Sequence, residues 1–360
     1  MKHLFTLSVL LTFSASLAPA QTHHTGEING AEFIVDVPAK PSGDVMLIAR
    51  GFRPDFFPVS AVYEVGTAFY QTLLNEGWTI ASTGFQSNDW VVAEGGQDIL
   101  ALRAYIEEEV HPIKRSFLYG ETMGGGVAVW LAENEPEHFS GVLCLGAHLF
   151  PEPAPDTTTS AVIADAFSMT PKLPIVFLAN GEEMLSSRTY TEQVADAEYT
   201  PILWFIDRPG HVNVNSAERL AAIQALVDWS EGQSIESVED GTIVMDPRSI
   251  AAVNNRSAAG NIRLLRPLYG NIYTSFVIGD LDQLGIQIGD TFTVTHGAQT
   301  HPITFAKAYS DVPYGEWVAF IDSESYVQVS RNYANAAETL AAAQGDPLML
   351  TKADQSRSNQ

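Results

Sequence analysis

The chain is organised around Gly120-Glu121-Thr122-Met123-Gly124-Gly125. An apolar run, Ser116–Tyr119, precedes it, and a helical pattern rich in Ala, Val and Leu, Val127–Glu133, follows it. This order predicts a strand, a tight turn and a helix. Glycines on both sides of the tip allow the turn to take a positive φ and the helix to pack close to the strand. Thr122 stands at the tip.

Short apolar runs alternate with amphipathic helical patterns from Gly26 to about Ser230. Several runs, such as Ile175-Val176-Phe177-Leu178, are apolar on both faces, as in a sheet that helices cover on each side. The alternation predicts an α/β domain with a doubly wound, mainly parallel sheet. The expected strands are Phe33–Val37, Val45–Ala49, Thr79–Ser82, Ser116–Tyr119, Gly141–Leu145, Pro174–Ala179 and Ile202–Ile206. The expected helices are Tyr63–Glu76, Gln97–Glu109, Met123–Glu133 and Ser216–Trp229.

The segment Glu231–Gly241 is rich in Glu, Gly, Ser and Asp, which predicts a linker. After it the pattern of apolar and polar residues changes. Short alternating runs and turn residues then predict a barrel-like, all-β domain with one late helix. The expected elements are strands at 272–278 and 291–294, Gly-Asp turns at 279–280 and 289–290, and a helix at 335–343. We therefore expect domains at 21–235 and 240–353, and a disordered polar tail at 354–360.

The first 20 residues have the composition of an export signal. A basic start, Met1-Lys2-His3, leads into an apolar run and then into Ala18-Pro19-Ala20. We expect cleavage before Gln21 and export to the periplasm or the extracellular space; the alternative is a buried N-terminal helix. No later segment approaches the roughly 20 uninterrupted apolar residues of a membrane span.

Acidic residues dominate the charge, with 43 Asp and Glu against 19 Lys and Arg and a formal net charge of −24. This balance argues against a nucleic-acid or anionic-membrane partner. The expected partner is a small-molecule substrate or ligand. The single Cys144 lies in the apolar run Gly141–Leu145, which predicts a buried strand residue without an internal disulfide or a metal cluster. We expect no metal and no cofactor.

Two further segments occupy informative positions around the Gly120–Gly125 turn. Ala49-Arg50-Gly51-Phe52 follows a predicted strand, and Arg208-Pro209-Gly210-His211-Val212 follows another. In this order the three segments make residues 30–230 resemble the α/β-hydrolase fold family. The resemblance implies that Thr122 occupies the nucleophile position and His211 that of the catalytic base. It also implies that the backbone N–H groups of Phe52 and Met123 form an oxyanion hole. The alternative for His211 is an ordinary surface-loop histidine.

Thr122 stands where the family pattern has serine. A hydroxyl becomes a useful nucleophile only when a base such as histidine takes its proton. Thr122 keeps the hydroxyl, but a β-branched residue is disfavoured in strained backbone, and its γ-methyl crowds the base and the incoming carbonyl. Because a small misplacement can cost on the order of a hundredfold in rate, an esterase-like acyl hydrolase and a catalytically degenerate protein both stay open.

The acid of the triad is irregular as well. The family places it after the strand that corresponds to Pro174–Ala179, often in Gly-x-x-Asp, and this chain reads Gly181-Glu182-Glu183-Met184. Strict spacing puts Met184 at the acid's position and Glu183 one residue early. Glu183 is the candidate acid; the alternatives are two solvated glutamates in a loop, or Glu152 as a more remote substitute.

Two motifs mark the second domain: Leu268-Tyr269-Gly270-Asn271-Ile272-Tyr273-Thr274, and a run that begins at Tyr309-Ser310-Asp311 and ends at Asn335-Ala336-Ala337. They make residues 240–353 resemble the C-terminal β-domain of the S-adenosylmethionine hydroxide adenosyltransferases. The resemblance implies that Tyr269 stacks on a base, that Asn271 hydrogen-bonds to it, and that Ser323 and Arg331 meet polar ends of the ligand.

That family carries its catalytic acidic residues in an N-terminal domain which nothing here resembles, and its site forms between subunits. The second domain can therefore supply one wall of such a site at most. Binding of an adenosine- or S-adenosylmethionine-like ligand, and a structural or assembly role within a homo-oligomer, both remain open.

Overall fold

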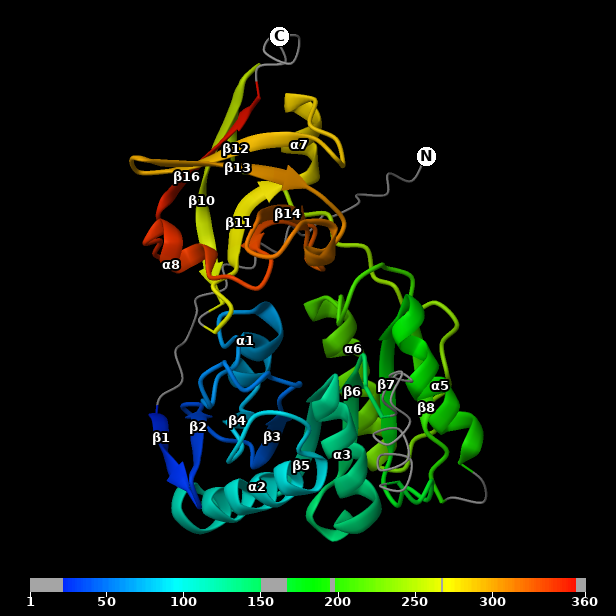
Figure 1. The fold of residues 1–360 in the computed structure, drawn as a ribbon. Coiled ribbons are helices and arrows are strands. Elements are labelled where there is room, and N and C mark those ends of the chain that lie inside the picture. The colour runs from blue at the N-terminus through cyan, green and yellow to red at the C-terminus, as the bar shows by residue number, and fades with distance from the viewer. Residues whose placement is uncertain (1–21, 150–166, 195–197, 267, 354–360) are drawn as a thin grey trace, which may run out of the picture.

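The computed structural model describes residues 22–149, 167–194, 198–266 and 268–353 of the chain (Figure 1). The expected export signal, Glu152 and the expected C-terminal tail lie outside these residues. Two β-sheets form two domains, one on each side of the segment that was expected to be a linker. None of the helices in the described part of the chain has the length and hydrophobicity of a membrane span.

The first sheet has eight strands. They are β1 (Thr22–Ile28), β2 (Ala31–Val37), β3 (Asp44–Ala49), β4 (Thr79–Thr83), β5 (Arg115–Glu121), β6 (Gly141–Leu145), β7 (Ile175–Asn180) and β8 (Ile202–Ile206). Their order is β1-β2-β4-β3-β5-β6-β7-β8, and the strands from β4 to β8 in this order are parallel to one another. Only β1 and β2 pair antiparallel with their neighbours. The expectation of a mainly parallel α/β sheet is confirmed.

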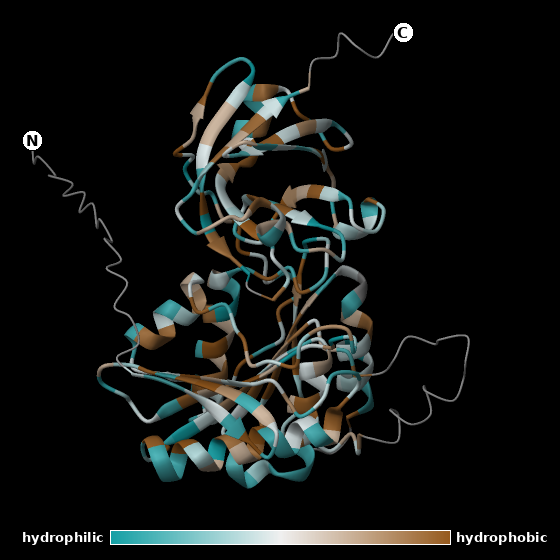
Figure 2. Ribbon diagram, turned by 60° about the vertical axis from the view of Figure 1, so that its left-hand side comes forward, coloured by the Kyte–Doolittle hydropathy of each residue, from teal (hydrophilic) through white to brown (hydrophobic). Residues whose placement is uncertain are grey.

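Helices cover both faces of this sheet. Successive residues of a strand point to opposite sides, and in the central strands both sets of side chains are apolar and need a covering layer. Leu118 packs into the core beneath α2 (Val92–Tyr105) and α3 (Met123–Asn134), whereas its neighbour Phe117 packs into the core beneath α1 (Ala68–Asn75) and α6 (Ser216–Ser230). Apolar residues accordingly run along the central strands of this domain, coloured brown in Figure 2. Cys144 lies in β6 and is fully buried, as expected.

The structure corrects several expected elements of the first domain. The strand β1 was not expected because its side chains are mostly exposed, and α5 (Met184–Gln193) was not expected because it buries only Ser187 and Tyr190. The helix expected from Tyr63 begins at Ala68, since Tyr63 hydrogen-bonds to Asp36 outside the helix. The helix expected from Gln97 begins at Val92 and continues into a π-helical turn, Ile106–Val110.

The second domain is a closed barrel, which confirms the expected all-β, barrel-like architecture. Its strands are β9 (Ala252–Val253), β10 (Ser257–Leu265), β11 (Ile272–Val277), β12 (Thr291–His296), β13 (Gln299–Phe305), β14 (Trp317–Ile321), β15 (Tyr326–Arg331) and β16 (Pro347–Lys352). The order is β11-β15-β14-β13-β12-β16-β10, and β10 pairs back with β11 to close the barrel, while the short β9 pairs antiparallel with β10. The late helix is α8 (Ala336–Leu340), shorter than expected.

The expected Gly-Asp turn at 279–280 is wrong. These residues lie in the first turn of α7 (Ile278–Leu284), where Asp280 Oδ2 accepts a hydrogen bond from Val277 N at 2.9 Å. An acidic residue at this position satisfies a free N–H group at the start of a helix. The same Gly-Asp pair is therefore compatible with a turn or with a helix start, and the tertiary structure decides between them.

The segment between the domains is bound to the first domain rather than free. Val238 forms an isolated parallel bridge with Trp204 of β8. Further on, Ile243 N donates to Glu218 Oε1 at 2.9 Å, and its carbonyl accepts from Asn215 Nδ2 at 2.7 Å. The linker therefore ends on the N-terminus of α6, close to the loop that follows β8.

Candidate functional site

Thr122 occupies a strained turn between β5 and α3. Its backbone has φ 52° and ψ −117°, a region that β-branched residues rarely adopt. The neighbouring glycines leave no room for a side chain: a Cβ on Gly124 would lie 1.9 Å from the Ala49 carbonyl oxygen, and one on Gly120 would lie 2.2 Å from the Gly124 carbonyl oxygen. This close packing lifts the Thr122 side chain out at the carboxyl end of β5.

The side chain of Thr122 is half-buried and constrained on two sides. Its Oγ1 accepts a hydrogen bond from Met123 N at 2.5 Å, and within the described residues it makes none with His211. Its γ-methyl points toward Gly51, where a Cβ would lie 2.6 Å from that methyl carbon. Catalytic hydrogen bonds are often formed only once substrate is bound, so this geometry describes the resting site.

His211 and Glu183 form a hydrogen-bonded pair. His211 follows β8, and Glu183 ends the 3₁₀ turn Gly181–Glu183 that follows β7. The Nδ1 of His211 is hydrogen-bonded to Glu183 Oε1, and Val212 N donates to both carboxylate oxygens at 3.2 and 3.1 Å. The hydrogen bond that His211 donates to Glu183 raises the pKa of His211 above its ordinary 6.5, although burial acts in the opposite direction. The one-residue displacement of the acid is therefore compatible with contact to the histidine.

The turn after β6 connects this pair to Thr122. Thr122 N donates to Leu145 O at 3.0 Å, and Thr122 O accepts from His148 N at 2.9 Å. The strained turn Gly120–Gly124, which we call the elbow, is therefore hydrogen-bonded on both sides of Gly146. Gly146 has φ 50°, and a Cβ on it would meet Glu183 Oε2 at 2.5 Å. Thr122 and Glu183 thus pack against the same short turn, and the structure brings the three expected catalytic residues to one edge of the sheet.

The two expected oxyanion-hole residues lie beside Thr122. Met123 is fully buried, and its N–H is engaged by Thr122 Oγ1. Phe52 lies in the loop after β3, directly after Gly51, and its N–H has no hydrogen-bond partner within the described residues. One of the two expected donors is therefore free in the resting site, and the other becomes free when Oγ1 moves.

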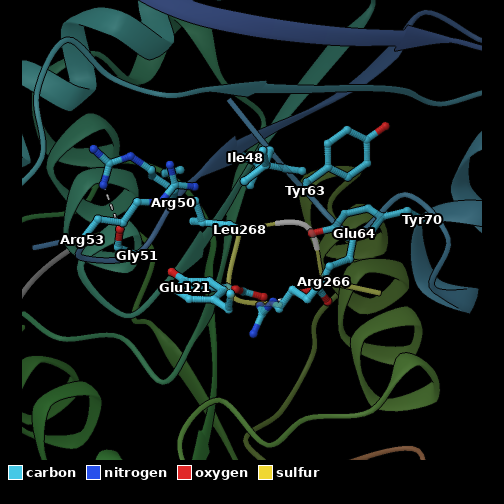
Figure 3. Close-up of a pocket in the computed structure, with 13 residues that line it drawn as sticks. Ile48, Arg50, Gly51, Arg53, Tyr63, Glu64, Tyr70, Glu121, Arg266 and Leu268 are labelled. Carbon is cyan, nitrogen blue, oxygen red and sulfur yellow. Dashed lines mark hydrogen bonds and ion pairs between the residues drawn. The ribbon is translucent and has the colours of Figure 1, made fainter. Parts of the chain in front are cut away.

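A pocket lies beside the elbow, between the two domains (Figure 3). The first domain contributes the carboxyl ends of β3 and β5, and the second contributes the segment between β10 and β11. Its volume is about 70 Å³. The residues that line it are Ile48, Ala49, Arg50, Gly51, Arg53, Val62, Tyr63, Glu64, Tyr70, Glu121, Arg266, Leu268 and Tyr269.

Ion pairs cross this pocket and its floor. Arg266 of the second domain pairs with Glu64 of the first. Burial acts to lower the pKa of Arg266, but the attraction of Glu64 and of other nearby groups together outweighs burial and raises this pKa well above the ordinary value. Glu121 pairs with Arg219 at 3.4 Å and accepts a hydrogen bond from the Tyr119 hydroxyl at 2.8 Å. The sequence interpretation missed the charged residues of this pocket, although basic residues beside the Phe52 loop are conspicuous in a chain with 19 Lys and Arg in total.

The structure separates the residues expected to bind an adenosyl ligand. Tyr269 lines the pocket and packs edge-on against Phe57, with ring centroids 5.5 Å apart. Asn271 is buried, and its Nδ2 donates to the Tyr309 hydroxyl at 2.8 Å. Asn271 lies at one end of β15, because Ile272 pairs with Val329.

Arg331 ends β15, a strand roughly 16 Å long, whereas Ser323 lies beyond the other end of this strand. Arg331 Nε donates to Gly315 O and Nη1 to Thr339 Oγ1, both at 2.9 Å. Ser323 lies in the turn that precedes the strand. Arg331 and Asn271 therefore use polar atoms within their own domain, and Ser323 does not converge with them.

One group of carboxylate and imidazole ligands in the described residues could hold a metal ion. It consists of Glu135, Glu137 and His138, which precede β6. Because the parallel strands β5 and β6 run in the same direction, this group lies at the edge of the sheet opposite Thr122. The residues of the elbow supply no comparable ligand set within the described part of the chain.

Comparison with known proteins supports the second resemblance directly. The family model of the SAM hydroxide adenosyltransferase C-terminal domain matches residues 268–349. No curated protein sequence matches the chain.

Solved structures match parts of the chain. A dienelactone hydrolase from Anabaena variabilis is 14% identical over 59% of this chain and 96% of its own, with a TM-score of 0.40. An S-formylglutathione hydrolase from Agrobacterium tumefaciens is 14% identical over 58% of this chain and 93% of its own, with a TM-score of 0.43. An uncharacterized conserved protein from Thermotoga maritima is 20% identical over 35% of this chain and 48% of its own length, with a TM-score of 0.27. The strand order and the elbow, rather than these likenesses, define the fold of the first domain.

Proposed function

We propose that the chain is an exported, esterase-like acyl hydrolase with an atypical Thr122-His211-Glu183 triad and slow turnover. The observation that carries this proposal is the hydrogen bond between Glu183 and Nδ1 of His211, formed beside a hydroxyl residue held at φ 52°. With Nδ1 bonded to Glu183, Nε2 is the ring nitrogen left for the nucleophile. Export is supported by the composition of the first 20 residues.

The proposed reaction has two steps, acylation of Thr122 and hydrolysis of the acyl-threonine, and the same residues act in both. Thr122 Oγ1 attacks the acyl carbon while His211 Nε2 takes its proton, and the Glu183 carboxylate stabilises the imidazolium. The Phe52 and Met123 N–H groups stabilise the oxyanion of the tetrahedral intermediate. Its collapse releases the alcohol, which receives the proton from His211. Water then attacks the acyl-threonine with His211 again as base, and the carboxylic acid and free Thr122 are regenerated.

Two features of the resting site support slow turnover. The γ-methyl of Thr122 is pressed toward Gly51, which restricts rotation of the side chain toward His211. The hydrogen bond from Met123 N to Oγ1 must also be broken before this N–H can stabilise an oxyanion. Both features leave the parts of the triad present while raising the barrier to their use.

Turnover of short p-nitrophenyl esters tests this proposal. We expect the wild-type protein to hydrolyse them at least about tenfold faster than Thr122→Ala and His211→Ala, since both variants remove a group that acts on the proton or the acyl carbon. All three proteins should show the same thermal unfolding profile, so that loss of fold is excluded. Equal background rates for the three would refute the proposal.

We propose that the second domain serves the first as a wall of its pocket, rather than holding a nucleoside. Arg266 and Tyr269 of this domain line the pocket, while Asn271 and Arg331 use polar atoms within the barrel. The competing function is that of a catalytically degenerate protein that binds an adenosine- or S-adenosylmethionine-like ligand, to which the family match at 268–349 gives some support.

A thermal-shift measurement separates these two functions. We expect adenosine and S-adenosylmethionine at millimolar concentration to leave the apparent Tm of the full-length protein unchanged. A ligand held by the native state at a hundred times its Kd would add about 2.7 kcal/mol to stability. A rise in Tm that Asn271→Ala abolishes would favour the nucleoside-binding function instead.

A further inference from the structure

We propose that Arg53 and Arg50 make the pocket beside Thr122 a carboxylate-binding site, so that the substrate is an ester that also carries a carboxylate. Calling the ligand a substrate rests on the proposed hydrolase function, but the carboxylate-binding site itself does not depend on turnover. The proposal is carried by the charges that line the pocket and by their position relative to Thr122.

Arg53 and Arg50 are buried without an acidic partner. Arg50 is 5% exposed and Arg53 is 3% exposed. Arg50 donates from Nε to Gly84 O at 2.8 Å, from Nη1 to Gly51 O at 3.0 Å, and from Nη2 to Ser87 O at 2.7 Å. Every one of these acceptors is neutral, and within the described residues Arg50 forms no ion pair.

Arg53 has more donors left than Arg50. Its Nη1 donates to Ser60 O at 2.6 Å, and hydrogen bonding to Tyr269 is the other interaction of its side chain. A guanidinium has five N–H donors, so several remain to meet a ligand. In the part of the chain that the structure describes, no carboxylate pairs with Arg53.

The acids of the pocket are already used. Glu64 pairs with Arg266, and Glu121 pairs with Arg219, so neither is left to neutralise Arg50 or Arg53. Burial and the nearby Arg53 charge lower the pKa of Arg50 to about 10, and Asp98 counteracts this only partly. Two positive charges without an ion-pair partner among the described residues therefore lie at one buried place in a chain of net charge −24.

An unpaired buried charge is costly unless a ligand compensates it. A carboxylate fits this place, because a guanidinium presents parallel N–H groups that match its two oxygens. The cavity of about 70 Å³ exceeds the roughly 10–15 Å³ that a single water needs, so it can admit a small polar group such as a carboxylate.

The position of the pocket ties this carboxylate to the reacting carbonyl. Arg53 follows Phe52, whose N–H is the proposed oxyanion donor, and Gly51 both lines the pocket and touches the Thr122 side chain. Figure 3 shows Arg50 and Arg53 together on one side of the pocket, with Arg266 and Glu64 on the other. A substrate can therefore place its ester at Thr122 and a charged end against Arg53.

Two esters with the same six-carbon acyl chain test the inference. Mono-p-nitrophenyl adipate carries a terminal carboxylate, and p-nitrophenyl hexanoate does not. We expect the wild-type protein to favour the adipate ester in kcat/KM by about tenfold or more, although the net charge alone predicts the reverse order. Arg53→Met should lower this ratio by at least about tenfold. Arg188→Met, which removes an exposed positive charge on α5, should leave the ratio unchanged.

Calorimetric titration with adipate provides a readout that needs no turnover. Adipate should bind the wild-type and Thr122→Ala proteins, adipamide should not, and Arg53→Met should lose the binding while Arg53→Lys keeps part of it. Binding of adipate without any ester turnover would refute the hydrolase function but support the carboxylate site. Two results would overturn the carboxylate site whether or not the variants fold. One is that adipate gives no binding heat with the wild-type protein; the other is that inorganic phosphate binds and adipate does not.

Discussion

Thr122→Ser is expected to raise kcat/KM for a short p-nitrophenyl ester by on the order of a hundredfold. The substitution deletes one methyl group, the one that now points toward Gly51, and keeps the hydroxyl. Without that methyl, the side chain can leave Met123 N and turn toward His211 Nε2. Serine also lacks the β-branch that disfavours threonine at φ 52°.

The measurement compares steady-state rates of wild type, Thr122→Ser and Thr122→Ala, with the same methyl deletion at Thr191→Ser on α5 as the control. Thr191 bonds to Ser187 O within its helix and lies outside the site. If Thr122→Ser and wild type hydrolyse the ester at the same rate, the methyl group is not what limits the reaction. If neither exceeds Thr122→Ala, the surrounding triad does not function.

Glu183→Gln in the Thr122→Ser background is expected to lower kcat by on the order of a thousandfold. The carboxylate of Glu183 accepts from His211 Nδ1 and, on both oxygens, from Val212 N. An amide must direct its NH₂ group at one of these N–H donors, so at least one hydrogen bond is lost. The imidazolium that forms in the reaction also loses its counter-charge.

The pH profile distinguishes this role from a merely structural one. His211 acts as a base only when neutral, so kcat/KM should rise with pH through a pKa above 6.5, the direction that Glu183 imposes. In Glu183→Gln the rise should move to lower pH, while Glu192→Gln, an exposed charge on α5, should leave it in place. An unshifted profile would mean that Glu183 does not act on His211 in solution.

The raised pKa of His211 affects stability in the opposite direction to activity: rising pH increases the rate but removes a contribution to folding. A protonated His211 paired with Glu183 favours the folded state below about pH 6.5, and this contribution is lost as the pH rises through the folded-state pKa. The imidazole is 64% exposed, so solvent screening keeps the effect small. We therefore expect the pair to matter for the proposed proton transfer far more than for folding.

The elbow could be predicted from sequence because its determinants are local. Gly120, Thr122 and Gly124 lie within five residues, and the strand before them and the helix after them follow from apolar periodicity. The barrel was also recognisable, since its strands alternate and its motifs are contiguous. The start of α2 and the whole of α5 were not predicted. The sequence expectation began the α2 helix five residues late, at Gln97, and α5 buries only Ser187 and Tyr190, too few residues for a periodic apolar pattern.

The contact between Glu183 and His211 could be suggested but not decided from sequence. Spacing favoured Met184 for the acid's position, and only the tertiary structure shows that the 3₁₀ turn after β7 carries Glu183 over Gly146. The pocket could not be predicted from the sequence at all. Its walls join Arg53 to Arg266, more than two hundred residues away in the chain, and no local pattern links them.

The linker has a consequence for how the molecule opens. Ile243, which lies between α6 and the first strand of the barrel, shares Glu218 with Arg208, the residue that begins the His211 loop. The segment that tethers the barrel and the segment that carries the proposed base therefore have one anchor, and loosening either exposes the hydrogen bonds of the other. We therefore expect their local unfolding free energies to be coupled. Cutting the chain at the linker should then loosen the His211 loop even with every triad residue intact.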